Sequence, residues 1–436
     1  MAAPRVAVAA SGGRDSTALL HCVVRGAAAL GIEVVALHVH HGLMPAADTW
    51  LRQVRGQSRR WGAAFMCHRL DGSPPPGASV EAWARGERYR ALAAMAREAG
   101  CGLVLLAHHR RDQAETWLLQ ALRGAGPAGL AAMPRQASRQ GLVWARPWLD
   151  QARQAIDAYV RRHRLQFVDD ASNADPRFAR NRLRAAVWPA LSAAFPDAET
   201  TLADAAVRAQ EASALATEVA TLDLAPLQQG GGLRVDLWQA LPPARRRNAL
   251  RAWLAGALAA PVPETLVQRL CSELPAANSG RWPAPGAELR LHRRLLDAAV
   301  PAPPFQHREP VTVDLHRPGI WPLPGWQGHF VVRTATAGGT VPDALRSVTA
   351  RERVGGERFR LAPRGAARSL KRQFQERGLA AWDRQGPLLY TAAGGLLFVP
   401  GLGINATQLA APGEMQLTLS WVPDGGQATG RRQAGG

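Results

Sequence analysis

Short apolar runs alternate with longer amphipathic segments over the first 120 residues. The runs at 5–10, 32–40, 64–70 and 103–108 are aliphatic or β-branched and predict strands, and the segments at 16–30, 47–61, 79–98 and 112–123 have helical spacing. Strands that alternate with helices of this length predict an α/β fold, a doubly wound parallel sheet with helices on both faces. Ligands of such sheets bind beyond the carboxyl ends of the strands.

The pattern changes near Phe195. Residues 196–300 have mainly helical spacing, 301–310 are proline-rich and read as a linker, and short β-type runs with glycine and proline turns follow. We therefore expect a doubly wound N-terminal domain at 1–195, a helical middle domain at 196–300 and a small α+β C-terminal domain at 311–425. A disordered tail is expected at 426–436.

Charge and cysteine usage narrow the class of protein. There are 53 basic against 34 acidic residues, a formal net charge of +19, which favours a polyanionic partner such as nucleic acid. Lys371 is the only lysine, so base composition of the genome explains arginine in place of lysine, but not the basic excess. The four cysteines, Cys22, Cys67, Cys101 and Cys271, are too far apart for a zinc or Cys-x-x-Cys motif. With no signal peptide or membrane span in the sequence, they predict a cytoplasmic protein.

The segment Ser11-Gly12-Gly13-Arg14-Asp15-Ser16 lies between the first predicted strand and the first helix. Backbone N–H groups of a glycine turn at a helix N-terminus bind phosphate, and the serines add hydroxyl donors. The segment is neither a Walker loop nor a dinucleotide fingerprint, because the required lysine and glycine spacings are absent. Asp15 would repel phosphate unless it binds magnesium or favours the helix dipole. The alternative is an ordinary strand-to-helix turn with a serine cap.

This hexapeptide resembles the SGGxDS loop of the PP-loop ATP pyrophosphatases. The resemblance implies that these six residues bind ATP, that Asp15 is a ligand of Mg²⁺, and that ATP is cleaved to AMP and pyrophosphate. Amidating, thiolating and ligating enzymes share the loop, so it does not identify the substrate.

Further motifs resemble those of the tRNA(Ile)-lysidine synthetase family, densely over residues 5–190 and again over 353–378. In chain order they are VHHGL at 39–43, ExxARxxRY at 81–89, AHHRRDQAET at 107–116, RGAGPAGL at 123–130, DASNAD at 170–175, RNRLR at 180–184, GGERFR at 355–360 and LKRQFQERG at 370–378.

The resemblance implies a reaction. ATP adenylates O2 of the wobble cytidine in the CAU anticodon of tRNA(Ile), and the amino group of free L-lysine is then joined to C2. It implies catalytic roles for Asp112, Glu115 and Arg180, with Asp112 also a magnesium ligand. It places four residues on the substrate side of the site: His40, His41, His109 and Arg184.

Structural alternatives exist for each of these residues. Asp112 could be a helix N-cap with Glu115 completing a capping box. The histidine pairs could be structural, and Arg180 and Arg184, four residues apart on one helix face, could pair with the acidic segment 169–170 rather than clamp phosphate. The chain departs from the family at Arg111, where an acidic or amide residue is common.

A dense basic cluster in the C-terminal part predicts a surface for the tRNA backbone, although charge runs are often only solvated faces. A second candidate lies in the helical middle segment. The predicted tRNA-binding residues are Arg245, Arg246, Arg358, Arg364, Arg368, Lys371 and Arg372.

Three other functions remain open at this point. A tRNA-thiolating enzyme with a cluster-held sulfur is disfavoured by the scattered cysteines. A small-molecule PP-loop ligase is disfavoured by the basic excess, and a non-catalytic RNA-binding module leaves Asp15 and Asp112 without a role. A homodimer is compatible with the sequence.

Overall fold

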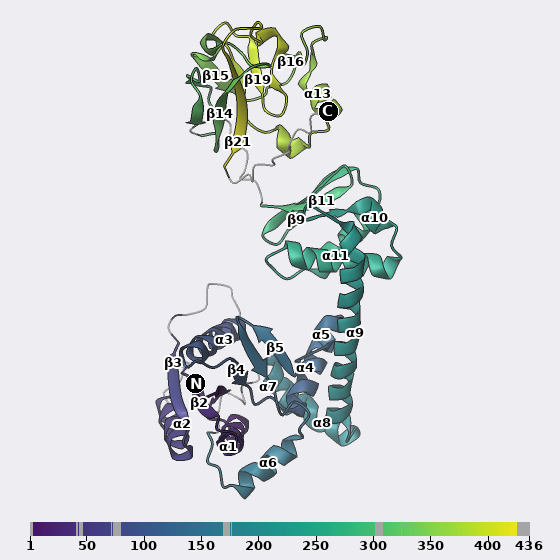
Figure 1. Ribbon diagram of the computed structural model, residues 1–436. Helices are drawn as coiled ribbons and strands as arrows, with labels where there is room; N and C mark the ends of the chain where they lie inside the picture. The colour runs from purple at the N-terminus through teal and green to yellow at the C-terminus, as the bar shows by residue number, and fades with distance from the viewer. Residues whose placement is uncertain are drawn as a thin grey trace. The chain divides into compact units, whose positions relative to one another are not determined.

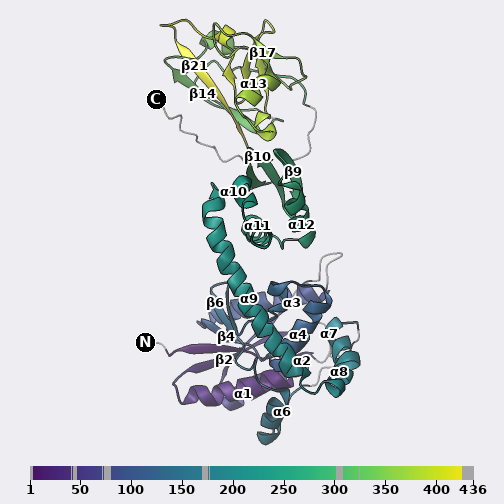
Figure 2. The ribbon, with the colours of Figure 1, turned by 90° about the vertical axis from the view of Figure 1, so that its right-hand side faces the viewer.

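The computed structural model describes residues 3–40, 42, 47–70, 72, 80–168, 175, 177–300, 308–323 and 325–424. The expected tail at 426–436 lies outside them. The chain forms two compact units, one of residues 1–227 with 241–253 and one of 228–240 with 254–436. Each unit is described by itself, and many of its elements are labelled in Figures 1 and 2.

A six-stranded sheet in the order β3-β2-β1-β4-β6-β5 is the centre of the first unit. Five strands are parallel and β5 is an antiparallel edge strand. The strands are β1 (Arg5–Ala9), β2 (Glu33–His40), β3 (Ala64–Arg69), β4 (Leu103–Leu105), β5 (Gln136–Arg139) and β6 (Leu142–Ala145). The predicted parallel sheet is confirmed, although the β5–β6 pair was not expected and β4 ends at Leu105 rather than at His108.

Helices cover both faces of this sheet, because its buried strands are apolar on both sides. Leu19 of α1 and Val54 of α2 belong to the core cluster on one face, and Leu92 of α3 belongs to the cluster on the other. The helices up to residue 227 are α1 (Arg14–Ala28), α2 (Ala47–Trp61), α3 (Val80–Glu98), α4 (Arg110–Leu122), α5 (Pro127–Leu130), α6 (Arg153–Arg162), α7 (Ala179–Arg182), a π-helical turn (Leu183–Val187), α8 (Trp188–Ala194) and α9 (Ala198–Leu227).

The expectation of a mainly helical middle part at 196–300 is confirmed, but this part also contains a sheet that was not expected. Helices α9, α10 (Val235–Gln239), α11 (Pro243–Ala257) and α12 (Glu264–Glu273) are present, but residues 279–299 form an antiparallel meander. In β10 the buried residues Leu289 and Leu291 alternate with partly exposed ones, a period of two rather than 3.6. The sheet has the order β7-β8-β11-β10-β9 and consists of β7 (Gln228–Gln229), β8 (Gly232–Arg234), β9 (Ser279–Ala284), β10 (Ala287–His292) and β11 (Leu295–Ala299).

The C-terminal part is α+β, as expected. Phe330, Leu389 and Leu417 lie in one core shared by its two larger sheets, and Phe359 and Phe374 lie in a smaller core around α13. Its elements are β12 (Val311–Val313), β13 (Gly319–Pro322), β14 (Gly328–Ala335), β15 (Val348–Arg351), β16 (Arg358–Phe359), β17 (Arg368–Ser369), α13 (Leu370–Glu376), β18 (Leu388–Tyr390), β19 (Leu396–Val399), β20 (Gly403–Ile404) and β21 (Gln416–Pro423), with 3-10 turns at Pro342–Leu345, Ala381–Arg384 and Ala406–Gln408. Among the described helices none is long and apolar enough to span a membrane.

Candidate active site

The loop between β1 and α1 has the geometry of an anion site. Gly13 is the N-cap of α1, and the hydroxyls of Ser11 and Ser16 lie 2.9 Å apart. Gly12 has φ +92°, and a Cβ there would lie 3.1 Å from Val54 Cγ2, so this position requires glycine. The Gly12 carbonyl accepts a hydrogen bond from Val168 N at 2.9 Å, which ties the loop to the segment after α6.

The Arg14 side chain lies on α6 rather than over the loop. Its guanidinium donates to Asp157 Oδ1 at 2.8 Å and lies 4.9 Å from the centre of the Phe167 ring. Arg14 thus links α1 to α6, and its contribution to ATP binding would come from its backbone at the helix N-terminus.

Asp15 faces His109, which lies at the start of α4, the helix that follows the neighbouring strand β4. His109 Nε2 lies 3.6 Å from Asp15 Oδ2 and 3.4 Å from Asp112 Oδ2. Asp15 Oδ1 is buried and has no hydrogen-bond partner among the described residues. One imidazole therefore joins the two carboxylates at the carboxyl edge of the sheet, where a ligand site was expected.

The first turn of α4 carries Asp112 at its third position. The N-cap is His109, and its backbone N–H donates to Asp112 Oδ2 at 3.1 Å. The capping alternative is thus partly correct, since Asp112 satisfies an N-terminal donor but is not itself the N-cap. Its other oxygen, Oδ1, accepts a hydrogen bond from Arg184 Nη2 at 2.8 Å.

Arg180 of α7 and Arg184 of the π-helical turn that follows α7 both reach α4. Arg184 Nε donates to Glu115 Oε1 at 2.8 Å, while Arg180 Nε lies 3.7 Å from Glu115 Oε2 and its Nη2 donates to Thr116 Oγ1 at 2.5 Å. Glu115 is fully buried, and its Oε2 accepts no hydrogen bond from the described residues. Both arginines thus pair with the acids of α4; the alternative partners at 169–170 lie outside the described residues.

The charges of the site depend on burial and on one another. Burial alone would lower the pKa of His109, but the nearby carboxylates of Asp15 and Asp112 raise it above its ordinary value. Burial alone would raise the pKa of Asp112, but His109, His108 and Arg184 hold it below its ordinary value. His108, desolvated by burial, has its pKa lowered to about 4. The site at neutral pH thus contains an ionised Asp112 and a neutral His108.

The histidines after β2 have different surroundings. His40 is buried, accepts a hydrogen bond from Gly42 N at Nδ1 (3.2 Å) and pairs through Nε2 with Asp48 Oδ1 (3.1 Å). Since Nδ1 is the acceptor, Nε2 carries the proton and donates to Asp48. His40 thus anchors the start of α2, while the predicted substrate-side residue His41 lies outside the described residues.

The acids fit magnesium better than a metal held by protein ligands alone. Among the described residues there is no group of three or more His, Cys, Asp or Glu side chains arranged around a metal site. Mg²⁺ is commonly bound by one or two carboxylates, with water and substrate phosphates as its other ligands. Asp15 and Asp112 match that donor set.

The predicted tRNA-binding residues fall into two groups. In the first unit Arg245 pairs with the buried Asp223 of α9, and Arg246 Nη2 donates to Leu241 O at 3.1 Å, so both bind their own fold.

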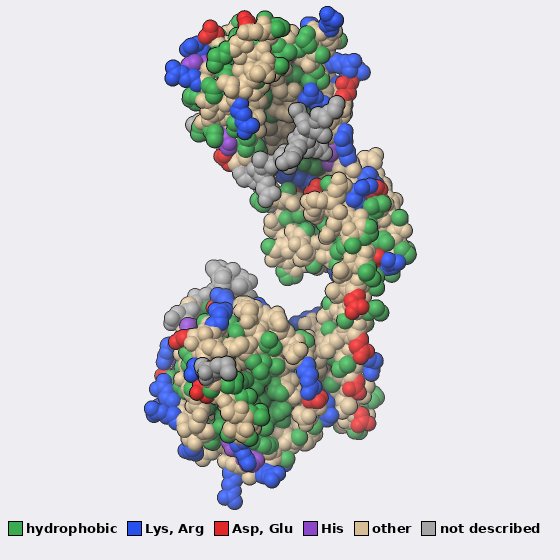
Figure 3. All heavy atoms as spheres, in the orientation of Figure 1, with side chains coloured by type: hydrophobic (Ala, Val, Ile, Leu, Met, Phe, Trp, Pro, Cys, Tyr) green, Lys and Arg blue, Asp and Glu red, His purple; other side chains and the backbone are tan. Residues whose placement is uncertain are grey.

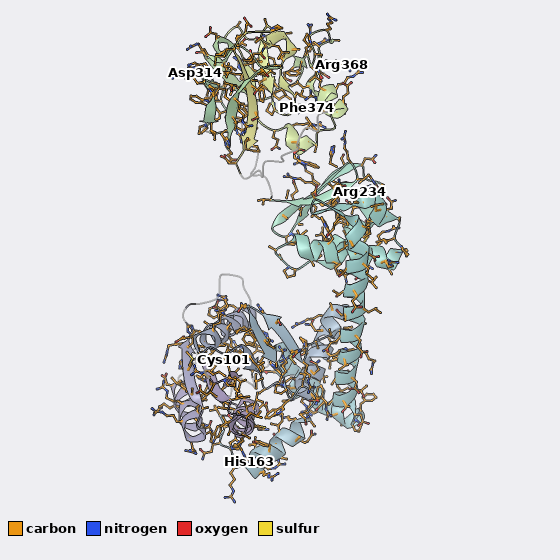
Figure 4. The ribbon with its side chains drawn as sticks, in the orientation of Figure 1. Cys101, His163, Arg234, Asp314, Arg368 and Phe374 are labelled. Atoms are coloured by element: carbon orange, nitrogen blue, oxygen red, sulfur yellow. The ribbon has the colours of Figure 1, made fainter. Side chains whose placement is uncertain are left out.

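In the C-terminal part, Arg364 and Lys371 are exposed, and Arg358 donates to Ala367 O. Arg368 and Arg372 both pair with Glu376 Oε1, at 2.7 and 3.0 Å, so this acid offsets part of the charge of the basic cluster. Figure 3 shows basic side chains spread over this part, and Figure 4 labels Arg368 and the neighbouring Phe374.

Sequence reasoning missed Glu199 of α9. It accepts hydrogen bonds from Arg110 and Arg111, which lie in the first turn of α4 beside Asp112. Its only sequence signal is an acid in the first turn of a helix, which is common and points to no particular partner.

Models of known protein domains match three parts of the chain. A PP-loop domain model matches residues 1–191, a TilS substrate binding domain model 233–296, and a TilS substrate C-terminal domain model 348–421.

Curated relatives align with nearly the whole chain. The tRNA(Ile)-lysidine synthase of Ralstonia nicotianae is 41% identical over 97% of this chain and 94% of its own length. Those of Burkholderia mallei and Alkalilimnicola ehrlichii are 39% and 36% identical, each over 96% of this chain and over 93% and 94% of their own lengths. With its PP-loop, its paired acids and these full-length matches, the chain belongs to the tRNA(Ile)-lysidine synthase family.

Proposed function

We propose that this protein is an ATP-dependent ligase that joins L-lysine to C2 of the wobble cytidine in the CAU anticodon of tRNA(Ile). Cytidine O2 attacks the α-phosphorus of ATP and pyrophosphate leaves; the lysine amino group then attacks C2 and AMP leaves with O2. The product is lysidine, which changes the codon read from AUG to AUA. The observation that carries this proposal is the meeting of Asp15 and Asp112 around His109 beside the glycine loop.

The loop residues Ser11, Gly12, Gly13, Asp15 and Ser16 would hold the phosphates of ATP through backbone N–H groups and hydroxyls. Asp15 and Asp112 would hold Mg²⁺, which supplies charge neutralisation at the phosphates during attack. The imidazole of His109, whose pKa is raised by these two carboxylates, lies beside both of them.

The buried acids also suit a cationic substrate. Glu115 Oε2 and Asp15 Oδ1 are buried oxygens without hydrogen-bond partners among the described residues, and burial makes an unsatisfied acceptor costly. A magnesium ion or the ammonium group of lysine would satisfy Asp15, whose side chain is partly exposed, whereas the fully buried Glu115 is paired with Arg180 and Arg184. Arg180 and Arg184 orient Glu115 and offset its charge; we assign catalytic roles to Glu115 and Arg180, and Arg184 to the substrate side of the site.

The basic C-terminal residues Arg358, Arg364, Arg368, Lys371 and Arg372 are proposed to bind the tRNA backbone. Arg245 and Arg246 are proposed for the same role through their exposed parts, with a weaker basis because both bind their own fold. We place the reaction in the cytoplasm, where the tRNA substrate is found. A homodimer stays a prediction, which sedimentation would test.

The experiment is incorporation of labelled lysine into tRNA by the full chain with ATP and Mg²⁺. We expect label in a tRNA(Ile) transcript with a CAU anticodon, release of AMP and pyrophosphate, and none without ATP. A transcript that differs only by a GAU anticodon is the matched control. ATP cleavage without label in the RNA would contradict the lysine assignment, and pyrophosphate exchange without tRNA would favour a small-molecule ligase.

A further inference from the structure

Helix α9 lies along α4, which carries Asp112, and also contacts α5 (Figures 1 and 2). The residues before and after Asp112 in the chain are both linked to side chains of α9. Arg111, which precedes Asp112, pairs with Glu199. Gln113, which follows Asp112, donates a hydrogen bond to the Met133 carbonyl, to which Gln210 also donates.

The contact before Asp112 is an ion-pair cluster. Glu199 Oε1 accepts a hydrogen bond from Arg110 Nε at 3.2 Å and its Oε2 accepts one from Arg111 Nε at 3.1 Å. The Glu199 side chain is only 11% exposed, and the Arg111 guanidinium lies 5.0 Å from the centre of the Trp188 ring. Two positive charges in the first turn of α4 oppose its dipole, so Glu199 offsets a charge arrangement that would otherwise destabilise this turn.

The contact after Asp112 is a network of amides. Gln113 donates to Met133 O at 2.9 Å and accepts from Met133 N at 3.0 Å. Gln210 of α9 donates to the same Met133 oxygen at 3.0 Å and to Ala131 O at 2.9 Å. All these groups are buried or partly buried, so each hydrogen bond restrains α4 against movement along α9.

We propose that Glu199 and Gln210 are positioning residues for the reaction: they hold the first turn of α4 so that Asp112 faces Asp15. This inference rests on the proposed function. Neither residue is itself a ligand of Asp112; each acts through the neighbour of that acid. Precise placement matters because a displacement of about 1 Å at a reacting group can reduce the rate on the order of 100-fold.

The pairing of Glu199 with Arg111 also accounts for an arginine at a position where the family commonly has an acidic or amide residue. An acid at this position would lie against Glu199 in a partly buried setting and would be repelled. Arginine at 111 and glutamate at 199 are therefore a matched pair in this chain, which predicts that the two positions depend on one another.

The test compares Glu199→Gln with Glu211→Gln in lysine incorporation by the full chain. Glu211 is an exposed acid of the same helix, so its substitution removes the same charge without affecting the contacts with Arg110 and Arg111. We expect Glu199→Gln to lower kcat roughly 10- to 100-fold, with KM for ATP, lysine and tRNA changed by less than about 2-fold. Glu211→Gln should match the parent protein.

A double variant separates positioning from loss of fold. If Glu199 acts through Arg111, then Glu199→Gln combined with Arg111→Gln should lose no more activity than the worse single variant. The inference is overturned if Glu199→Gln has the kcat of Glu211→Gln, or if its loss of activity follows a lower folded fraction by thermal melting. An inactive parent protein would instead refute the proposed function.

Discussion

At the scale of single residues, charges in this protein are set by close partners. Asp112 lies between a backbone N–H and Arg184, and His109 lies between two carboxylates. Such arrangements are typical of sites where a charge must be present before the substrate arrives.

Asp112→Asn should abolish adenylation of the tRNA, because the amide keeps the shape of the side chain but loses the negative charge that a metal ion requires. Asp150→Asn, which breaks an exposed pair with Arg135, is the matched control. Single-turnover release of pyrophosphate measures the step, and filter binding should show tRNA affinity unchanged. Near-normal turnover would remove the catalytic role of Asp112.

His38→Asn should weaken the dependence of stability on pH. His38 is buried beside Ala10 O at 2.7 Å, and burial lowers the pKa of its imidazole. Below the ordinary value of about 6.5 the unfolded chain therefore binds more protons than the folded one, so stability falls as the pH drops through that value.

The asparagine can keep the hydrogen bond to Ala10 without titrating. Thermal melting between pH 7.5 and 5 should show a smaller decrease than in the parent protein. His68→Asn, at an exposed position of the neighbouring strand, should leave the pH slope unchanged. Equal slopes for all three proteins would contradict the argument.

At the scale of elements, short turns determine the position of the chemistry. The glycine loop begins α1 and the turn at His109 begins α4, and the parallel strands β1 and β4 are adjacent in the sheet. Two helix N-termini therefore meet at one edge, and their acids meet with them.

Gly12→Ala should destabilise the first unit by about 1–2 kcal/mol, because the backbone there has φ +92° and a Cβ would press on Val54. Gly13→Ala is a control for stability alone, since Gly13 has φ −70° and room for a methyl group. Urea unfolding measures both variants. If both lose the same free energy of unfolding, the positive φ of Gly12 is not the cause.

At the scale of the whole molecule, the basic excess is distributed rather than concentrated around Asp15 and Asp112. Arg180 and Arg184 pair with acids, whereas Arg364 and Lys371 of the C-terminal part are exposed. Tethering by nonspecific charge can therefore act apart from the residues that carry the chemistry.

Replacing Arg364, Arg368 and Arg372 with alanine should weaken tRNA binding and reduce the slope of log affinity against log salt by up to about 3. Replacing the exposed residues Arg317, Arg333 and Arg346 removes the same charge elsewhere in this part and is the matched control. Fluorescence titration between 50 and 200 mM salt measures the slope. Identical slopes for the two triple variants would mean that the cluster at 364–372 is only a solvated face.

Local pattern was sufficient for much of the fold. The period of hydrophobic residues predicted the parallel sheet and the helices α1 to α4, because each element buries one apolar face wherever its partners lie. It failed at 279–299, where the strands β9–β11 are short and interrupted by glycine and proline, so their period of two is hard to distinguish from helical spacing.

The sequence by itself determined the glycine loop, the identity of Asp15 and Asp112 as chemically unusual residues, and the family to which they point. Only the tertiary structure decided their partners: that His109 joins the two acids, that Arg184 pairs with Asp112, that Arg14 turns to Asp157, and that Glu199 holds Arg111. The reason is physical. Motifs depend on spacing along one element, whereas ion pairs between side chains 72 to 143 residues apart depend on how helices pack, which no local pattern encodes.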